Sequence, residues 1–404
     1  MRGQSNEVLS MKKVISLLLV AMMVLSLCPS VLAARVDENR NVKISATCSK
    51  DVSQLAAQHL RSMQEQLGAD CVAIGFQPDV FMNMTAMTPF TVYTFDENGK
   101  IVSNDTYMSL LIYSSRVVGT IGIGYDESGN YCYSLGTNYA EEMNTLLHST
   151  DLTVNEGIVV GRFGDKLFAT DGIRVKILLE TPMNLQGKAS CEKVQISDIC
   201  GEAKKNAGES FCEIVAIDDA AAVKNETYKA EEQQPTRLAK DPPNPMPIPH
   251  IEQTGVCGAA AWAAVLNYRL KTNYDNDSLE TAMHNGGYAN GTGGNPKMTD
   301  YRDYANDVHD AGCVHISSPP SFSKLTKAID AGRPIMGCWG SGSGSDKSYH
   351  AVVITGYIKN SANNYTYYVK NPWHPNATTI TVTSSSSVVY PDANYTWTLL
   401  DSVY

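Results

Sequence analysis

A charged and then proline-rich stretch divides the chain near its middle and limits which folds are open to it. Residues 225–250 read NETYKAEEQQPTRLAKDPPNPMPIPH. Proline lacks the backbone N–H that a sheet ladder needs and favours extended backbone, so this stretch indicates a connection between domains. Because 404 residues exceed the usual size of one domain, we expect two domains joined by a linker at residues 231–249.

The N-terminus has the layout of a secretory signal peptide. In MKKVISLLLVAMMVLSLCPSVLAA, two lysines precede an apolar run that ends in small residues. The alternative is an uncleaved membrane anchor, for which the run is near the short end. We therefore expect residues 1–34 to be removed, and the protein to be secreted and free of the membrane afterwards.

Composition and cysteine spacing exclude several functions. A net charge of -10 with no basic stripe argues against nucleic acid as a partner. There is no CxxC, HExxH, P-loop or GxGxxG motif, so the sequence predicts neither a metal nor a cofactor. Of ten cysteines, nine follow the signal segment, and an odd number leaves at least one thiol unpaired within a monomer.

Residues 35–230 are predicted to form a mixed α/β domain. Helical spacing of apolar residues indicates helices at 52–67 and 139–147, and β-rich runs joined by glycine-containing turns indicate hairpins within 88–102, 117–135 and 157–172. The histidines of this part, His59 and His148, lie on helical stretches and are interpreted as surface or packing residues. This half therefore shows no catalytic constellation and is expected to have a binding or folding role.

Residues 250–404 place helices before strands, the pattern of an α+β domain with an antiparallel sheet. The expected helices are Cys257–Leu270, Ser278–His284, Thr299–Ala311 and Ser321–Ala331, the last ended by Gly332. The expected strands are 334–339, 350–358, 365–371, 378–383 and 394–400, which are rich in Val, Ile, Thr and Tyr.

Cys257, in EQTGVCGAAAWAAV, is expected in the first turn of an alanine-rich helix. Unpaired backbone N–H groups and the positive end of the helix dipole favour a thiolate there, with a pKa lowered from about 8.5 to roughly 3.5–7.5. The alternative is a cysteine that only packs in the core.

A nucleophilic thiolate needs an imidazole within reach and a group that orients the imidazole. His350 begins the strand HAVVITGYI, and Asn371 ends the next strand, YTYYVKN. If the two strands form a hairpin, the start of one lies beside the end of the other, and the two side chains become neighbours. Trp373 would then shield their hydrogen bond from water, unless it is simply a core aromatic.

These residues together resemble a family: a cysteine at a helix start, a histidine in YHAVVITGY and an asparagine in KNPW, in that order. They resemble the papain-like cysteine peptidases, and among them the bacterial staphopain-like and C39-like enzymes. The resemblance implies a papain-like catalytic domain, with a helical part and an antiparallel sheet, that acts on protein or peptide substrates. It implies Cys257 as nucleophile, His350 as general acid and base and Asn371 as the orienting residue.

The resemblance also implies a glutamine that donates to the oxyanion. Here that residue would be Gln253, although the family commonly has it six positions before the cysteine, where this chain has Ile251. The flanking sequence departs as well, since Gly258 stands where an aromatic residue follows the cysteine in plant and lysosomal relatives.

Residues 35–230 resemble the prodomain of staphopain-like precursors, which implies that the N-terminal prodomain is itself a partner of the peptidase. Arg237 and Lys240 in the linker offer places for processing. Two other readings stay open: an amidase, peptidoglycan hydrolase or transferase that uses the same Cys–His pair, and a secreted binding protein without catalysis. The remaining residues, interpreted as surface or structural, are His250, His284, His309, His315 and His374, with Cys313 and Cys338 as packed strand residues that could also pair with each other.

Overall fold

The computed structural model describes residues 39–45, 50–96, 98–149, 151–153, 157–164, 166–180, 196–206, 211–217, 244–289, 295–341, 348–361, 364–382, 388–392 and 396–404. The chain divides into two compact units, Met1–Arg40 with Ile217–Val223 and Asn41–Ala216 with Lys224–Tyr404. Of the first unit only Asn39, Arg40 and Ile217 are described. The predicted signal segment and most of the predicted linker lie outside the described residues.

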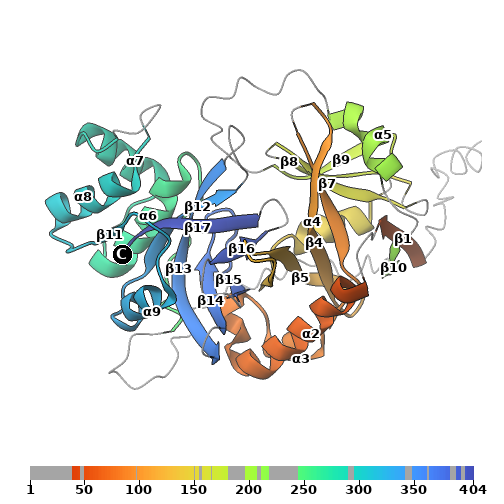
Figure 1. Ribbon diagram of the computed structural model, residues 1–404, viewed down its shortest axis with the longest axis horizontal. Coiled ribbons are helices and arrows are strands. Elements are labelled where there is room, and N and C mark those ends of the chain that lie inside the picture. Colours follow the sequence, from red (N-terminus) through yellow and green to blue (C-terminus); the bar gives the residue numbers. More distant parts are fainter. Residues whose placement is uncertain are drawn as a thin grey trace, which may run out of the picture. The chain divides into compact units, whose positions relative to one another are not determined.

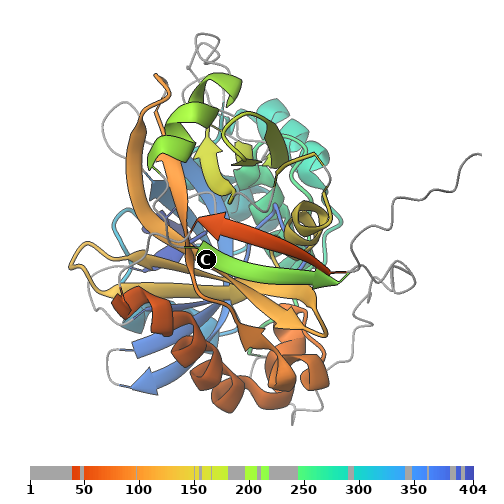
Figure 2. The same cartoon turned by 90° about the vertical axis from the view of Figure 1, so that its right-hand side faces the viewer.

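The N-terminal half forms the three predicted hairpins. β3 (Phe90–Phe95) pairs antiparallel with β4 (Ile101–Tyr113), β5 (Arg116–Tyr125) with β6 (Tyr131–Gly136), and β7 (Val159–Phe163) with β8 (Lys166–Thr170). The sequence did not predict η1 (Gly68–Ile74), α3 (Pro78–Asn83), α5 (Ile196–Asn206), β2 (Thr85–Ala86) or β9 (Val175–Glu180). Nor did it predict β1 (Asn39–Ser45) and β10 (Phe211–Ile217), which lie side by side as a separate pair (Figure 2).

The two predicted helices of this half are α2 (Lys50–Leu67) and α4 (Ala140–Leu147). The apolar face of α2 repeats every three to four residues and is buried, as the spacing predicts. His59 lies on α2 and stacks on Tyr133, with ring centroids 4.4 Å apart, so its packing role is confirmed.

The C-terminal half has the predicted order of helices before strands. The helices are α6 (Cys257–Leu270), α7 (Asn276–Asn285), α8 (Met298–His309) and α9 (Phe322–Asp330). The strands are β11 (His315–Ile316), β12 (Ile335–Ser341), β13 (Ser348–Ser361), β14 (Asn364–Lys370), β15 (Thr378–Val382), β16 (Val389–Pro391) and β17 (Thr396–Val403). In Figure 1, β12, β13 and β14 run side by side, and α6 packs on β13.

Local chemistry explains the helix ends in this half. Asp275 caps α7 by accepting a hydrogen bond of 2.7 Å from the backbone N–H of Ser278, so the helix begins two residues before its predicted start. α9 ends one residue earlier than predicted, and Gly332 follows it with φ of +70°, a conformation that glycine adopts easily.

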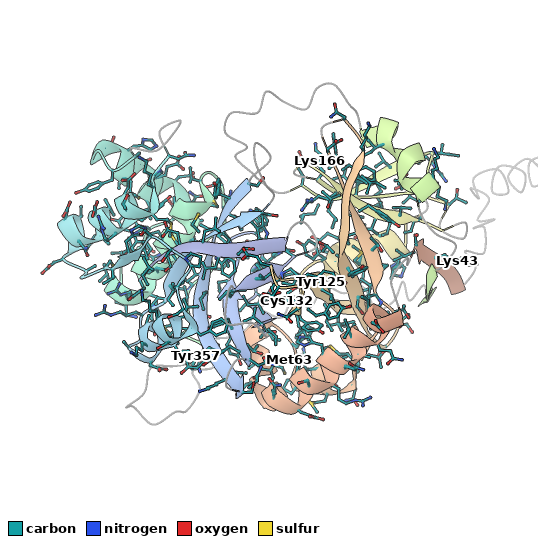
Figure 3. All side chains as sticks on the ribbon, in the orientation of Figure 1. Lys43, Met63, Tyr125, Cys132, Lys166 and Tyr357 are labelled. Carbon is teal, nitrogen blue, oxygen red and sulfur yellow. The ribbon has the colours of Figure 1, made fainter. Side chains whose placement is uncertain are left out.

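One mostly antiparallel sheet of 15 strands runs through both halves in the described part of the chain, so the fold is α+β. The two halves meet where β15 pairs antiparallel with β6, with Ile380 opposite Ser134. Cys132 of β6, labelled in Figure 3, packs into the core of the C-terminal half, and Met63 of α2 lies 3.9 Å from the Thr381 hydroxyl. The sequence, interpreted as two domains, did not predict this shared sheet.

The last residues of the predicted linker pack against the C-terminal half. Met246 and Ile248 are buried in its core, and the Met246 N–H donates to the Thr355 carbonyl at 2.8 Å. Among the described residues, no helix is long and apolar enough to cross a membrane.

Candidate active site

Cys257 is the first residue of α6, as the sequence predicts. The helix is buried on nearly all sides because alanine dominates it, so α6 can sit deep between β13 and the other helices. Cys257 is half-buried at its start. The helix thus presents one thiol at the edge of the core.

The thiol is not activated in the way the helix start suggested. Burial raises the pKa of Cys257, and hydrogen bonds with the backbone of Ala351, Gly258 and Cys257 itself lower it by less. The expectation of a lowered pKa is therefore wrong for this state of the protein, because loss of water outweighs the backbone N–H groups. The contact with Ala351 places the sulfur beside the residue that follows His350.

The loop before Cys257 is fixed from α7. Asn276 accepts hydrogen bonds from the backbone N–H groups of Thr254 and Gly255 at 2.8 and 2.9 Å, and it is almost completely buried. The Val256 N–H donates to Glu280 at 3.3 Å. These contacts order the backbone that leads from Gln253 to the cysteine.

Tyr301 of α8 leaves no room for a side chain at position 258. A Cβ at Gly258 would lie 2.3 Å from the hydroxyl of Tyr301, which is far inside van der Waals contact. Tyr301 is buried and meets Trp262 edge-on, with centroids 6.3 Å apart. An aromatic ring therefore does cover the first turn of α6, but it belongs to Tyr301 of α8 and not to the residue that follows the cysteine.

His350 and Asn371 meet across the predicted hairpin of β13 and β14. The strands pair antiparallel, with Val353 opposite Lys370, so the start of one adjoins the end of the other. His350 Nε2 lies 2.8 Å from Asn371 Oδ1, and both side chains are nearly inaccessible. Burial lowers the pKa of His350 to about 4, although the hydrogen bond with Asn371 raises it.

Trp373 connects the histidine to the glutamine. Its ring stacks on His350, with centroids 3.8 Å apart and planes inclined by 17°. Its backbone N–H donates to Asn371 Oδ1 at 3.0 Å, and its indole N–H donates to Gln253 Oε1 at 2.9 Å. The Gln253 amide nitrogen in turn donates to the Gly255 carbonyl at 3.1 Å. Trp373 therefore shields the His–Asn bond and also brings Gln253 into the same group.

The two pKa shifts favour neutral forms of both groups at neutral pH. Burial lowers the pKa of His350 to about 4, and burial raises the pKa of the Cys257 thiol. In this arrangement the imidazole is unprotonated and the thiol keeps its proton.

The other predicted residues lie as follows. His374 is buried and meets the Tyr139 ring of the N-terminal half edge-on at 5.1 Å, and His315 lies 2.8 Å from Asp401. Cys338 is in β12, but Cys313 precedes β11 rather than lying in a strand, and neither forms a disulfide in the described part of the chain. Sequence reasoning missed Asn276 and Tyr301, since a lone polar or aromatic residue carries no signal until the fold brings it to a site.

The Peptidase_C39 like family matches residues 245–395. This part of the chain is therefore similar to the C39-like peptidases. The match begins where the chain starts to pack against β13 and spans the regions of Cys257, His350 and Asn371. A search of the curated proteins finds no match to the chain.

Proposed function

We propose that this protein is a secreted cysteine endopeptidase that cleaves peptide bonds through Cys257, His350 and Asn371. The observation that carries the proposal is the 2.8 Å bond between His350 and Asn371 beneath the stacked Trp373 ring. A catalytic imidazole must keep one orientation while it gives and takes protons. The hydrogen bond to Asn371 and the stacked Trp373 ring together hold the His350 ring in one orientation, which a purely structural histidine does not need.

The use of the two ring nitrogens follows from that bond. Nε2 of His350 is engaged by Asn371 Oδ1, which leaves Nδ1 for the thiol. As Nδ1 takes the proton of Cys257, the sulfur attacks the carbonyl carbon of the scissile bond. The imidazolium then protonates the leaving amine, and a water activated by the same nitrogen hydrolyses the thioester. Asn371 keeps the ring aligned through both proton transfers.

Gln253 is the proposed oxyanion donor, together with the backbone N–H of Cys257. Its carboxamide is nearly buried and held at its oxygen by Trp373, which directs the amide group towards the cysteine loop. A donor fixed in advance stabilises the developing charge at no reorganisation cost.

We further propose that the N-terminal half is a prodomain and that the chain leaves the cell as a precursor. The signal-like segment and the basic residues of the linker support this, and so does the sheet that β6 shares with β15. The expected processing site lies near Arg237 or Lys240. N-terminal sequencing of the extracellular form locates the cut, and equal activity of the intact chain and of the chain cut in the linker, with both segments present, would remove the inhibitory role.

Thiol labelling tests the catalytic claim directly. Cys338 is the matched control, because it is a cysteine outside any disulfide and is half-buried in the same half of the chain. We expect iodoacetamide to label Cys257 much faster than Cys338, and His350→Ala to bring the two rates together, with loss of cleavage of an unfolded protein. Equal labelling rates in the unmodified protein would refute the nucleophile. Fast labelling without cleavage of protein would favour an amidase or transferase instead.

A further inference from the structure

The residue at the N-cap of α6 cannot cap the helix. Val256 takes this position with extended backbone, φ of -80° and ψ of 123°. A polar N-cap side chain accepts a hydrogen bond from an N–H group of the first turn, and valine has no atom that can do so. The position of Cys257, the first residue of the helix, must therefore be fixed from outside α6.

One side chain of α7 holds the backbone that leads into this helix. Asn276 Oδ1 accepts hydrogen bonds from the N–H groups of Thr254 and Gly255 at 2.8 and 2.9 Å. Its Nδ2 donates to the Val256 carbonyl at 3.4 Å, and the side chain is only 1% exposed. A single buried carboxamide thus contacts the backbone of the three consecutive residues that precede the cysteine.

The start of α7 is a firm base for this carboxamide. Asn276 is the first residue of the helix, and a capping box surrounds it: the Ser278 N–H donates to Asp275 Oδ1 at 2.7 Å, and the Asp275 N–H donates to Ser278 Oγ at 2.9 Å. The loop also packs closely on α7, since a Cβ at Gly255 would lie 2.6 Å from Glu280 Oε2. The loop therefore has no room to approach α7, and Asn276 keeps it from moving away.

The backbone of Gly255 connects Asn276 to Gln253, the proposed oxyanion donor. The Gly255 N–H donates to Asn276, and the Gly255 carbonyl accepts from Gln253 Nε2 at 3.1 Å. On its other side, Gln253 Oε1 accepts from the indole N–H of Trp373, whose ring stacks on His350. The carboxamide of Gln253 is thus held from α7 through the loop and from the histidine side through the tryptophan.

We propose that Asn276 is a positioning residue for the oxyanion hole, which fixes Gln253 relative to the backbone N–H of Cys257 by holding the loop between them. Donors must be in place before the charge develops, and a displacement of about 1 Å can cost about 100-fold in rate. Asn276 acts through the loop and not on the substrate. This inference rests on the proposed function, because the loop matters to the rate only if Cys257 is the nucleophile.

The test compares Asn276→Ala with Asn306→Ala in the full-length chain. Asn306 of α8 is the matched control, because its carboxamide holds another loop in the same way. Its Oδ1 accepts from the Cys313 N–H at 2.6 Å, and its Nδ2 donates to the Cys313 carbonyl at 3.1 Å. Both variants release the backbone of a loop, but only the loop held by Asn276 leads to Cys257.

Asn276→Ala is expected to lower kcat/KM about 5- to 100-fold, mainly through kcat, because the hydrogen bonds that hold the loop are lost. Labelling of Cys257 by iodoacetamide should stay within about threefold, since alkylation forms no oxyanion. Asn306→Ala should leave both rates within about twofold. If Asn276→Ala does not fold, Asn276→Ser takes its place, because a serine hydroxyl is one atom too short for the two N–H groups but keeps the site polar.

Two results would overturn the inference in an active enzyme. One is a loss of cleavage in the Asn276 variant that is no larger than the loss in Asn306→Ala. The other is an equal fall of cleavage and labelling, which would mean that Asn276 only keeps this part of the chain folded. A wild-type protein with neither cleavage nor selective labelling of Cys257 would overturn the proposed function, and the positioning role with it.

Discussion

Trp373→Phe separates the two contacts of this residue, the ring stacked on His350 and the indole N–H that donates to Gln253. Phenylalanine keeps an aromatic ring over His350, where the present rings stack at 3.8 Å. It also keeps the backbone N–H that donates to Asn371, but it removes the indole N–H that holds Gln253 Oε1 at 2.9 Å. The change therefore acts mainly on the glutamine.

The size of the effect can be bracketed. A buried acceptor left without its donor costs about 1–3 kcal/mol. If all of that is lost from the transition state, kcat/KM falls about 5- to 150-fold at 1.36 kcal/mol per factor of ten. Complete removal of an oxyanion donor costs about 100- to 1000-fold, so Gln253→Ala gives the upper limit and Trp373→Phe should fall below it.

Two assays on the same variant make the prediction sharp. Peptide cleavage forms an oxyanion at a carbonyl, whereas iodoacetamide reacts with the thiol at a methylene carbon and forms none. We expect Trp373→Phe to slow cleavage within the bracket above and to leave the labelling rate of Cys257 within about twofold, a free-energy change below about 0.4 kcal/mol. Gln253→Ala should show the same contrast. If cleavage and labelling fall together, the indole acts on His350, and the reasoning about Gln253 fails.

Three further predictions concern pH and packing. The kcat/KM profile should rise through an acid limb near pH 4, where His350 loses its proton, and then stay level through neutral pH; an acid limb near 6.5 would contradict the buried histidine. The free energy of unfolding should fall as the pH falls. Burial lowers the pKa of His350 to about 4 and the pKa values of His59 and His374 to about 3, so these histidines bind protons at a higher pH in the unfolded chain than in the folded one. The loss begins below about pH 6.5, continues to about pH 3 and amounts to at most about 1.4 kcal/mol per histidine per pH unit; a thermal midpoint that stays level from pH 7 to 5 would contradict it. Gly258→Ala should cost about 1–3 kcal/mol of stability and most of the labelling of Cys257, since the new Cβ meets the Tyr301 hydroxyl, whereas Gly201→Ala, with open space around it, should not.

Where the fold could be predicted from sequence, the signal was local. α6 begins and ends at the predicted residues because alanine and a long apolar run favour helix whatever surrounds them. The hairpin of β13 and β14 follows from two β-rich runs with a short polar connection, and with it came the meeting of His350 and Asn371.

What could not be predicted depended on distant parts of the chain. Nothing in YCYSLG and TTITV says that these two strands pair, although β6 and β15 do so across more than 240 residues of sequence. The pKa of Cys257 was predicted in the wrong direction for a related reason. A helix start is visible in the sequence, but the burial that outweighs it is supplied by other elements.

The shared sheet limits how the proposed prodomain could act. A propeptide that only covers a cleft can leave after cleavage at little cost, but removal of β6 would expose the backbone edge of β15 to water or to other chains. It would also strip Thr378 and Asp392 of the partners that Asn138 and Tyr139 provide. Processing in the linker should therefore yield two segments that stay together through the pairing of β6 with β15. On this reasoning the proposed cut would regulate access to the site, while the sheet shared by both segments would keep the geometry of the site.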